Sequence, residues 1–185
     1  MVDVPVVEIK DLFSSDDKCK LDMAKRLGKA FAQHGLVYIT NHGLENLCSK
    51  ALVTVKEFFD LPQSKMDEIH KENSYRGYFR FLEEQSGGKS DWKEGIYYFY
   101  ENLKIDEDAP ESIFIGTNPW PSKENVAEFQ DVVSQYFKEV RKLAYEVLDT
   151  LALCLGNCAF ILINIIIKLI IIIMMMMKSY YKYNK

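Results

Sequence analysis

The alternation of apolar and polar residues predicts short strands and amphipathic helices over the first 156 positions. An apolar stretch at residues 4–9 that contains Pro5 is typical of an edge strand. A helix is predicted next, capped by Ser14 or Ser15 at its start and ended by Gly35 in a left-handed conformation. The apolar face of this helix is predicted to consist of Leu21, Ala24, Leu27 and Phe31.

The following segment predicts a strand, a turn and a second helix. Residues 36–40 are rich in apolar and β-prone side chains, and Asn41, His42 and Gly43 favour a turn after them. The second helix is predicted to stop before Pro62, because the residue that precedes a proline disfavours helical backbone. Its predicted apolar face consists of Leu44, Leu47, Ala51, Leu52, Val55, Phe58 and Phe59.

The remaining pattern predicts two more strands and a long helix. A short helix is expected at residues 64–70, and strands are expected at residues 75–82 and 96–100. The aromatic residues at 97–100 are expected to pack in the sheet or the core, and residues 102–120 are expected to form a long loop. The apolar residues that predict one long amphipathic helix are Phe129, Val133, Tyr136, Val140, Leu143, Val147, Leu151 and Leu155.

The composition changes abruptly after Gly156. Residues 1–156 contain seven isoleucines, whereas residues 161–173 contain nine and are followed by four consecutive methionines. From Phe160 onward the chain contains only Phe, Ile, Leu, Asn, Lys, Met, Ser and Tyr, most of which have A/T-rich codons. We therefore place a domain boundary at 156 and interpret residues 157–185 as a non-homologous read-through of A/T-rich non-coding DNA.

The alternative interpretation of this tail is a membrane anchor at residues 158–177. About 20 apolar residues are needed to span a bilayer. Lys168 would lie near the middle of the span, at a cost of roughly 3 kcal/mol on the insertion scale. Under this interpretation the protein is associated with a membrane.

Charge and cysteine content narrow the function classes. The formal net charge is −4, but 19 of the 23 basic residues and all 27 acidic residues precede residue 157, so the preceding domain carries −8. Such a domain gives no reason to expect nucleic-acid binding. The short apolar N-terminus does not resemble a signal peptide, and a cytoplasmic protein with reduced thiols is expected. No C-x2-C pair, and hence no zinc site, occurs among Cys19, Cys48, Cys154 and Cys158.

Several short motifs together carry a resemblance to one family. Residues 35–43 have the sequence GLVYITNHG, which resembles the G-F-hydrophobic-Tyr-hydrophobic-x-Asn-His-Gly signature of the N-terminal region of isopenicillin N synthase-like, non-haem iron(II)/2-oxoglutarate dioxygenases. The resemblance covers residues 4–156. The other motifs, in the expected order, are VPVV at 4–7, FFDLP at 58–62 with Lys65, GY at 77–78, DWKE at 91–94, NPWP at 118–121 and LALCLG at 151–156.

The resemblance implies a fold and a chemistry for the complete enzyme. The fold class is α+β, in which this N-terminal region of helices and strands, with its long C-terminal helix, wraps a double-stranded β-helix (jelly roll) that is largely absent here. Iron(II), held by an H-x-D…H triad, acts with O2 and with 2-oxoglutarate, held by R-x-S, to hydroxylate or desaturate a small-molecule substrate. Two imidazoles and one carboxylate on one face of the metal leave three positions open.

The iron motifs of that family are absent from this sequence. Its three histidines are His34, His42 and His70, and neither H-x-D nor R-x-S occurs. His70, Lys71 and Glu72 form an H-x-E with no later histidine to complete a triad, so we interpret them as solvated polar residues. His42 is interpreted as a turn residue whose imidazole bonds the local backbone, and His34 as a helix-end residue. No catalytic, cofactor-binding or metal-binding residue is assigned, and no cofactor is expected in this chain.

Three residues are candidates for the substrate pocket. In the family, the segment that Gly77 and Tyr78 resemble can face the pocket, so Tyr78 and its neighbours Arg76 and Arg80 are the candidates. A guanidinium group pairs well with a substrate carboxylate. The alternative is an ordinary charged face beside an aromatic core residue.

Three functional hypotheses follow. The first is a truncated member of the dioxygenase (oxidoreductase) family that is inactive alone. The second is a binding or regulatory fragment, held at a membrane by residues 158–177 or paired with a partner through open strand edges. The third is an active enzyme with a different iron site. We prefer the first because the triad is missing.

Overall fold

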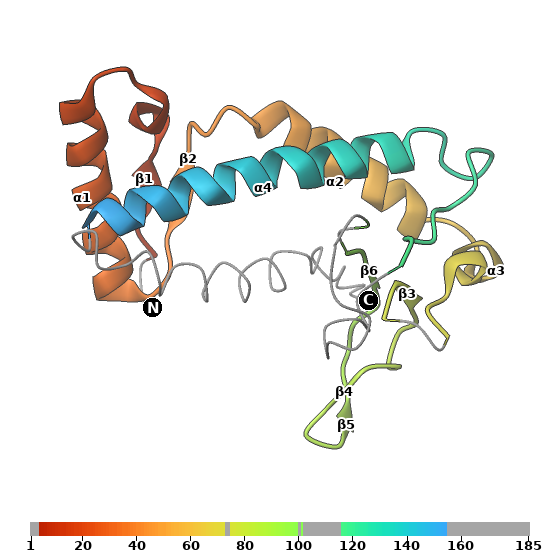
Figure 1. Cartoon of the computed structure of the whole chain (residues 1–185). Helices are drawn as coiled ribbons and strands as arrows, with labels where there is room; N and C mark the ends of the chain where they lie inside the picture. Colours follow the sequence, from red (N-terminus) through yellow and green to blue (C-terminus); the bar gives the residue numbers. More distant parts are fainter. Residues whose placement is uncertain (1–3, 73–74, 100, 102–115, 155–185) are drawn as a thin grey trace. The chain divides into compact units, whose positions relative to one another are not determined.

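The structure is a computed structural model that describes residues 4–72, 75–99, 101 and 116–154. The chain divides into two compact units (Figure 1). The first combines residues 4–50 with residues 134–154, and the second holds the described residues from 51 to 133. Both units contain helices and short strands, as the predicted α+β class requires.

The first unit contains a pair of parallel strands. Strand β1 (Val6–Glu8) pairs with β2 (Tyr38–Thr40), and the 3-10 helix η1 (Lys10–Phe13) and α1 (Asp17–His34) connect them. The carbonyl oxygen of Pro5 accepts a hydrogen bond from the N–H of Tyr38 at 2.9 Å. Both strands lie where the sequence predicted them.

The ends of α1 show which polar residues act as caps. The predicted Ser14 or Ser15 cap is wrong, because the N-cap is Asp16, whose carboxylate accepts from the N–H of Lys18 at 2.8 Å. The hydroxyl of Ser14 instead accepts from the N–H of Asp16 at 3.1 Å. At the other end the prediction is confirmed. Gly35 has a φ of 72° and its N–H donates to Phe31 O at 2.8 Å.

The core of the first unit is built from α1, the segment before it and α4 (Phe129–Cys154). The predicted apolar face of α1 is correct at Ala24 and Leu27 but wrong at Leu21, which is exposed. The buried face is shifted toward Met23 and Ala30, which places Leu21 at its margin. The residues that form this core or pack against it are Ile9, Leu12, Met23, Leu27, Val7, Phe31, Val37, Ile39, Leu143, Val147 and Leu151.

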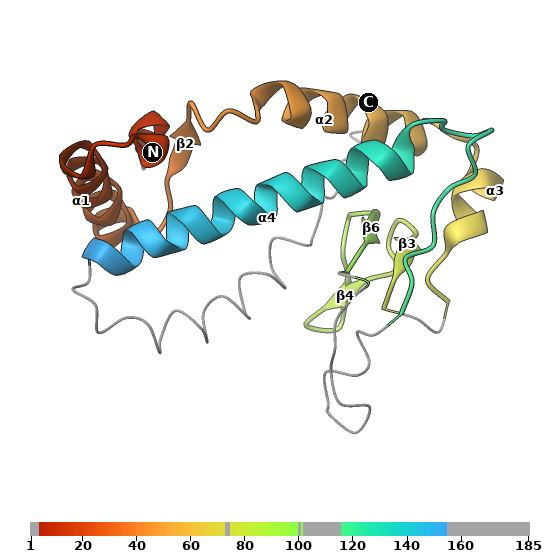
Figure 2. The ribbon, with the colours of Figure 1, turned by 45° about the horizontal axis from the view of Figure 1, so that its top comes forward.

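Helix α4 is continuous over its 26 residues (Figure 2). It begins at the predicted Phe129, and the predicted Leu155 lies outside the described residues. Near its end, the Sγ of Cys154 donates to Ala24 O at 2.7 Å. A Cβ on Gly28 would lie 3.0 Å from that sulfur, so the glycine permits the close approach of α1 and α4.

Helix α2 (Glu45–Phe59) follows the predicted turn. Its buried residues include Ala51, Val55 and Phe58, at the i, i+4 and i+7 spacing of one helical stripe. The prediction was wrong for Leu52, which is exposed, because the residue next to Ala51 lies about 100° further around the helix.

The second unit contains short helices and antiparallel strands. Its elements after α2 are α3 (Gln63–Met66), the 3-10 helix η2 (Asp67–Ile69), β3 (Gly77–Phe79), β4 (Gln85–Ser86), β5 (Lys89–Ser90) and β6 (Gly95–Tyr97). Strand β3 pairs with β6, and β4 pairs with β5 in a hairpin closed by two glycines with positive φ. The strands predicted at 75–82 and 96–100 are present but shorter, and β4 and β5 were not predicted.

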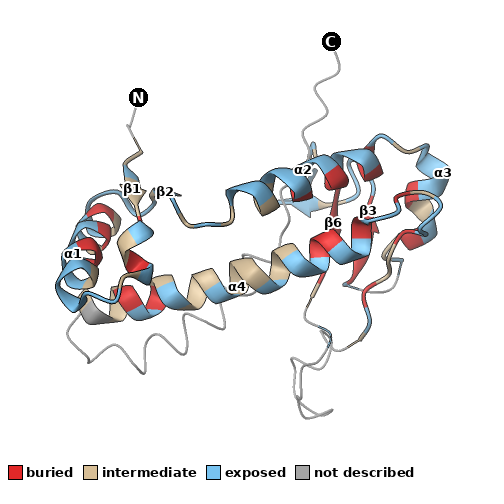
Figure 3. Ribbon diagram, turned by 90° about the horizontal axis from the view of Figure 1, so that it is seen from above, coloured by how far each residue is buried: buried red, intermediate tan, exposed pale blue. Residues whose placement is uncertain are grey.

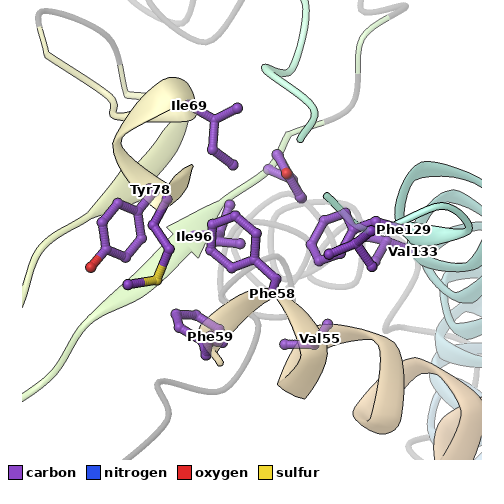
Figure 4. Close-up of a cluster of buried hydrophobic side chains, with 11 residues drawn as sticks. Val55, Phe58, Phe59, Ile69, Tyr78, Ile96, Phe129 and Val133 are labelled. Atoms are coloured by element: carbon purple, nitrogen blue, oxygen red, sulfur yellow. The ribbon is translucent and has the colours of Figure 1, made fainter. Parts of the chain in front are cut away.

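An aromatic core holds the second unit together (Figure 4). The ring of Phe58 lies 5.9 Å from that of Tyr78 and 5.5 Å from that of Phe129. Residues of β3 and β6 are largely buried (Figure 3). The buried residues of this core are Val55, Phe58, Phe59, Met66, Ile69, Tyr78, Ile96, Tyr98, Val126, Phe129 and Val133.

The described strands form three two-stranded sheets, and no closed barrel occurs in this part of the chain. Within the same residues, we find no helix with the length and apolar character that crossing a membrane requires. The tail at 157–185, including the proposed anchor at 158–177, and most of the loop predicted at 102–120 lie outside the described residues.

Candidate functional site

The three predicted pocket residues lie on or beside β3, yet their surroundings differ. Tyr78 is the middle residue of the strand, and Arg76 and Arg80 flank it. Arg76 and Tyr78 are buried, with 4% and 0% of their surface exposed, whereas the side chain of Arg80 is about half exposed at 48%. The strand therefore does not present the three side chains together to solvent.

Tyr78 is held by polar partners at its hydroxyl. The hydroxyl donates to Glu94 Oε2 at 2.7 Å and accepts from Gln63 Nε2 at 3.3 Å. Burial raises the pKa of Tyr78, the bond from Gln63 opposes that rise, and the neighbouring carboxylate of Glu94 adds to it. Tyr78 is therefore a neutral hydrogen-bond donor.

Glu94 is a buried carboxylate that the sequence did not single out as functional. It belongs to the DWKE motif, precedes β6 and is 5% exposed. The following Gly95 is required for close packing, because a Cβ there would lie 2.6 Å from the ring of Phe79. A buried carboxylate needs a hydrogen-bond donor, and Tyr78 supplies one.

Arg76 points into a polar cluster instead of solvent. Its Nη1 donates to Asn118 Oδ1 at 2.5 Å and to Phe99 O at 3.1 Å, and its guanidinium lies 5.3 Å from the ring centre of Phe99. Burial lowers its pKa, and the charge of Glu101 raises it. These contacts give Arg76 a structural role in this cluster.

Asn118 is the centre of that cluster. Its side chain accepts from Phe99 N–H at 3.0 Å and donates to Phe99 O at 2.8 Å. Its own N–H donates to Glu101 Oε1 at 2.6 Å. Asn118 belongs to the NPWP motif, and its contacts with residues 17 and 19 positions away were not predictable from the motif.

Arg80 forms an ion pair at the surface. Its Nε donates to Asp67 Oδ1 at 2.8 Å, and its backbone N–H donates to Glu83 Oε2 at 2.6 Å. The hydrogen bond from Arg80 lowers the pKa of Asp67, burial opposes that effect, and a bond from Gln63 adds to it. Within the described residues, the guanidinium of Arg80 is hydrogen-bonded through Nε alone.

Two of the three histidines are engaged in local contacts. The predicted role of His42 is confirmed, because its Nδ1 accepts from the N–H of Leu44 at 3.1 Å. The prediction that His70 is solvated is wrong. Its side chain is 12% exposed, its Nε2 lies 3.0 and 3.1 Å from the carboxylate oxygens of Glu83, and its Nδ1 accepts from the N–H of Glu72 at 3.2 Å. His34 is the last residue of α1 and is exposed.

These contacts do not fit an iron(II) site. A facial triad needs two imidazole nitrogens and a carboxylate directed at one point. In the described part of the chain, no group of three or more histidine, cysteine, aspartate or glutamate side chains converges in that way. Both nitrogens of His70 face hydrogen-bond partners instead.

The sequence matches one family of enzymes. A family model described as non-haem dioxygenase in morphine synthesis N-terminal matches residues 4–123. The chain belongs to this family. The predicted dioxygenase resemblance is therefore confirmed for the N-terminal region that the matched residues define.

The relatives of this chain include two enzymes. Leucoanthocyanidin dioxygenase of Malus domestica is 27% identical over 157 residues, which cover 83% of this chain and 41% of the relative. The 1-aminocyclopropane-1-carboxylate oxidase of Dictyostelium mucoroides is 28% identical over 162 residues, which cover 83% of this chain and 42% of the relative. The chain thus spans less than half the length of these relatives.

Solved structures share the fold of this dioxygenase region. A full-length Neurospora crassa protein, crystallised in complex with alpha-KG, matches with a TM-score of 0.63 at 23% identity, over 80% of this chain and 46% of that one. A putative 2OG-Fe(II) oxygenase family protein from Caulobacter crescentus matches with a TM-score of 0.63 at 22% identity, over 82% and 48%. At this identity the likeness shows the fold alone.

Proposed function

We propose that this chain forms the N-terminal region of an iron(II)- and 2-oxoglutarate-dependent oxygenase of a small molecule, and that it neither holds iron nor catalyses turnover by itself. Its membership of the dioxygenase family supports the first part. Two observations support the second part. In the described part of the chain no three histidine, cysteine, aspartate or glutamate side chains converge on one point, and both nitrogens of His70 face local hydrogen-bond partners.

Arg80 is the candidate that we propose for substrate contact. Arg76 donates to buried Asn118 and Tyr78 donates to buried Glu94, which supports structural roles for both. Arg80 keeps its Nη groups at a half-exposed position, and a guanidinium there suits an anionic group of the substrate.

The proposal is tested by measuring succinate formation from 2-oxoglutarate with the full chain, iron(II) and ascorbate under air. We expect no iron-dependent succinate above a protein-free control. A chimera in which residues 4–156 replace the matching region of the Malus relative supplies the positive test, and we expect it to form succinate. Turnover by the chain alone, or a folded chimera that binds iron and shows no turnover, would contradict the proposal.

The role of Arg80 is tested in the same chimera. We expect Arg80→Ala to raise the KM for an anionic substrate and to leave uncoupled 2-oxoglutarate turnover unchanged. Asp67→Asn is the matched control, because it removes the negative charge that pairs with Arg80 and keeps the guanidinium. An unchanged KM in the Arg80→Ala chimera would show that Arg80 serves only the surface ion pair.

A further inference from the structure

We propose that His70 is a pH-responsive contact of the second unit. Its neutral imidazole hydrogen-bonds two strained turns, and protonation breaks the bond to one of them. The two turns lie on either side of β3 in the sequence. The first runs from His70 to Glu72, and the second runs from Arg80 to Glu83.

The contacts of His70 define its tautomer. The N–H of Glu72 can only donate, so Nδ1 of His70, 3.2 Å away, must carry a lone pair. The proton of the neutral ring is then on Nε2, which donates to the carboxylate of Glu83. The neutral imidazole of His70 therefore accepts a hydrogen bond from the first turn and donates one to the second.

Both turns contain a non-glycine residue in the left-handed region. Glu72 has a φ of 36° and Leu82 has a φ of 65°, and they are the two described residues of the second unit with this property apart from glycines. Such backbone persists where surrounding contacts hold it in place. Here the imidazole binds the N–H of Glu72, and the carboxylate of Glu83 joins His70 to the N–H of Arg80.

The second turn has hydrogen bonds that do not involve His70. The N–H of Glu83 donates to Arg80 O at 3.1 Å, and the side chain of Arg80 is tied to Asp67. Among the described contacts, the N–H of Glu72 depends on His70. Loss of the Nδ1 acceptor therefore affects the first turn selectively.

The charged groups around His70 come from three segments. They are Asp67 and Glu68 on η2, Lys71 next to His70, and Arg80, Glu83 and Glu84 after β3. The backbone of Tyr78 in β3 also forms a β-bridge with that of His70. Lys71 is paired with Glu84, and Glu68 with Lys65. Burial raises the pKa of Glu83, but bonds from Arg80 and His70 outweigh this and hold it below its ordinary value. Glu83 thus stays ionised where histidines titrate.

Protonation changes one of the two bonds. A proton on Nδ1 places two donors face to face, so the bond from the N–H of Glu72 is lost. The Nε2–H of the imidazolium continues to donate to Glu83, and the added charge strengthens that contact. Acidification is therefore expected to release the turn at Glu72 and to keep the turn at Leu82.

The test is amide hydrogen exchange and ¹⁵N spectroscopy of the full chain between pH ~8 and ~5, the range in which histidine takes up a proton. After correction for intrinsic rates, we expect protection of the Glu72 amide to fall about fivefold or more, and that of the Arg80 amide to hold. Imidazole ¹⁵N shifts should report the Nε2–H tautomer at pH ~8.

Two variants separate the contacts. His70→Asn places a carbonyl oxygen in the role of Nδ1 without a titrating group, and Glu72 protection should then be independent of pH. Glu83→Gln keeps an acceptor for Nε2–H, and the pH response of Glu72 should persist. An Nδ1–H tautomer at pH ~8, equal loss of protection in both turns, or a pH response that survives in His70→Asn would overturn the proposal.

Discussion

The side chain of Asn118 accepts a hydrogen bond from the N–H of Phe99 at 3.0 Å and donates one to the carbonyl oxygen of Phe99 at 2.8 Å. It acts as a neighbouring strand would and fixes the chain after β6. We expect Asn118→Ala to lower the free energy of unfolding by about 2–3 kcal/mol, because several buried partners lose their bonds. Urea denaturation followed by circular dichroism measures this.

Asn118→Asp is the matched control for that substitution. An aspartate keeps the acceptor for Phe99 N–H and for Arg76 but cannot donate to Phe99 O. It should destabilise less than alanine. An alanine variant as stable as the parent chain would show that the bonds to Phe99 do not support the fold.

The two tyrosine hydroxyls in the core of the second unit are expected to contribute unequally to the free energy of unfolding. Tyr78→Phe removes the donor to buried Glu94 and should cost about 1–3 kcal/mol. Tyr98→Phe is the paired control, because the hydroxyl of Tyr98 is buried with no hydrogen-bond partner in the described structure. That substitution should be neutral or stabilising in the same urea measurement. Equal losses in both variants would contradict this assignment.

Gly77 is expected to tolerate no side chain. It has a φ of 115°, and a Cβ there would lie 2.4 Å from Ile69 O. Gly77→Ala should therefore destabilise the chain by more than about 2 kcal/mol in thermal or urea unfolding. Gly87→Ala, at a φ of 58° with open space around it, should cost only about 1 kcal/mol. A reversed order would contradict the packing at β3.

Acid is expected to weaken the contacts of Asp67. Its folded-state pKa is lowered by the bond from Arg80, so the ionised form is favoured in the folded chain. This stability is present above the unfolded pKa and is lost as the pH falls through the lower folded value, below about 4. Asp67→Asn should flatten the pH dependence of the urea midpoint in that range. An unchanged slope in the variant would show that other carboxylates dominate.

Local signals in the sequence predicted the elements but not the site contacts. Gly35 and the turn at 41–43 are specified by short-range backbone chemistry, and both were predicted correctly. The partners of Arg76 and Tyr78 lie 42 and 16 residues away, and no periodicity encodes such contacts. The burial of Glu94 was missed for the same reason. A glutamate in a sequence is expected to be solvated, and its hydrogen-bond donor, Tyr78, lies 16 residues away.

Anaerobic calorimetric titration of iron(II) into the full chain, with and without 2-oxoglutarate, tests the central claim most directly. We expect no stoichiometric binding in either case, because the described side chains that could bind a metal do not converge on one point and both nitrogens of His70 face local partners. The chimera with the Malus relative serves as the binding control. Tight binding of one iron per chain, abolished by His70→Ala, would contradict this expectation and identify His70 as a metal ligand.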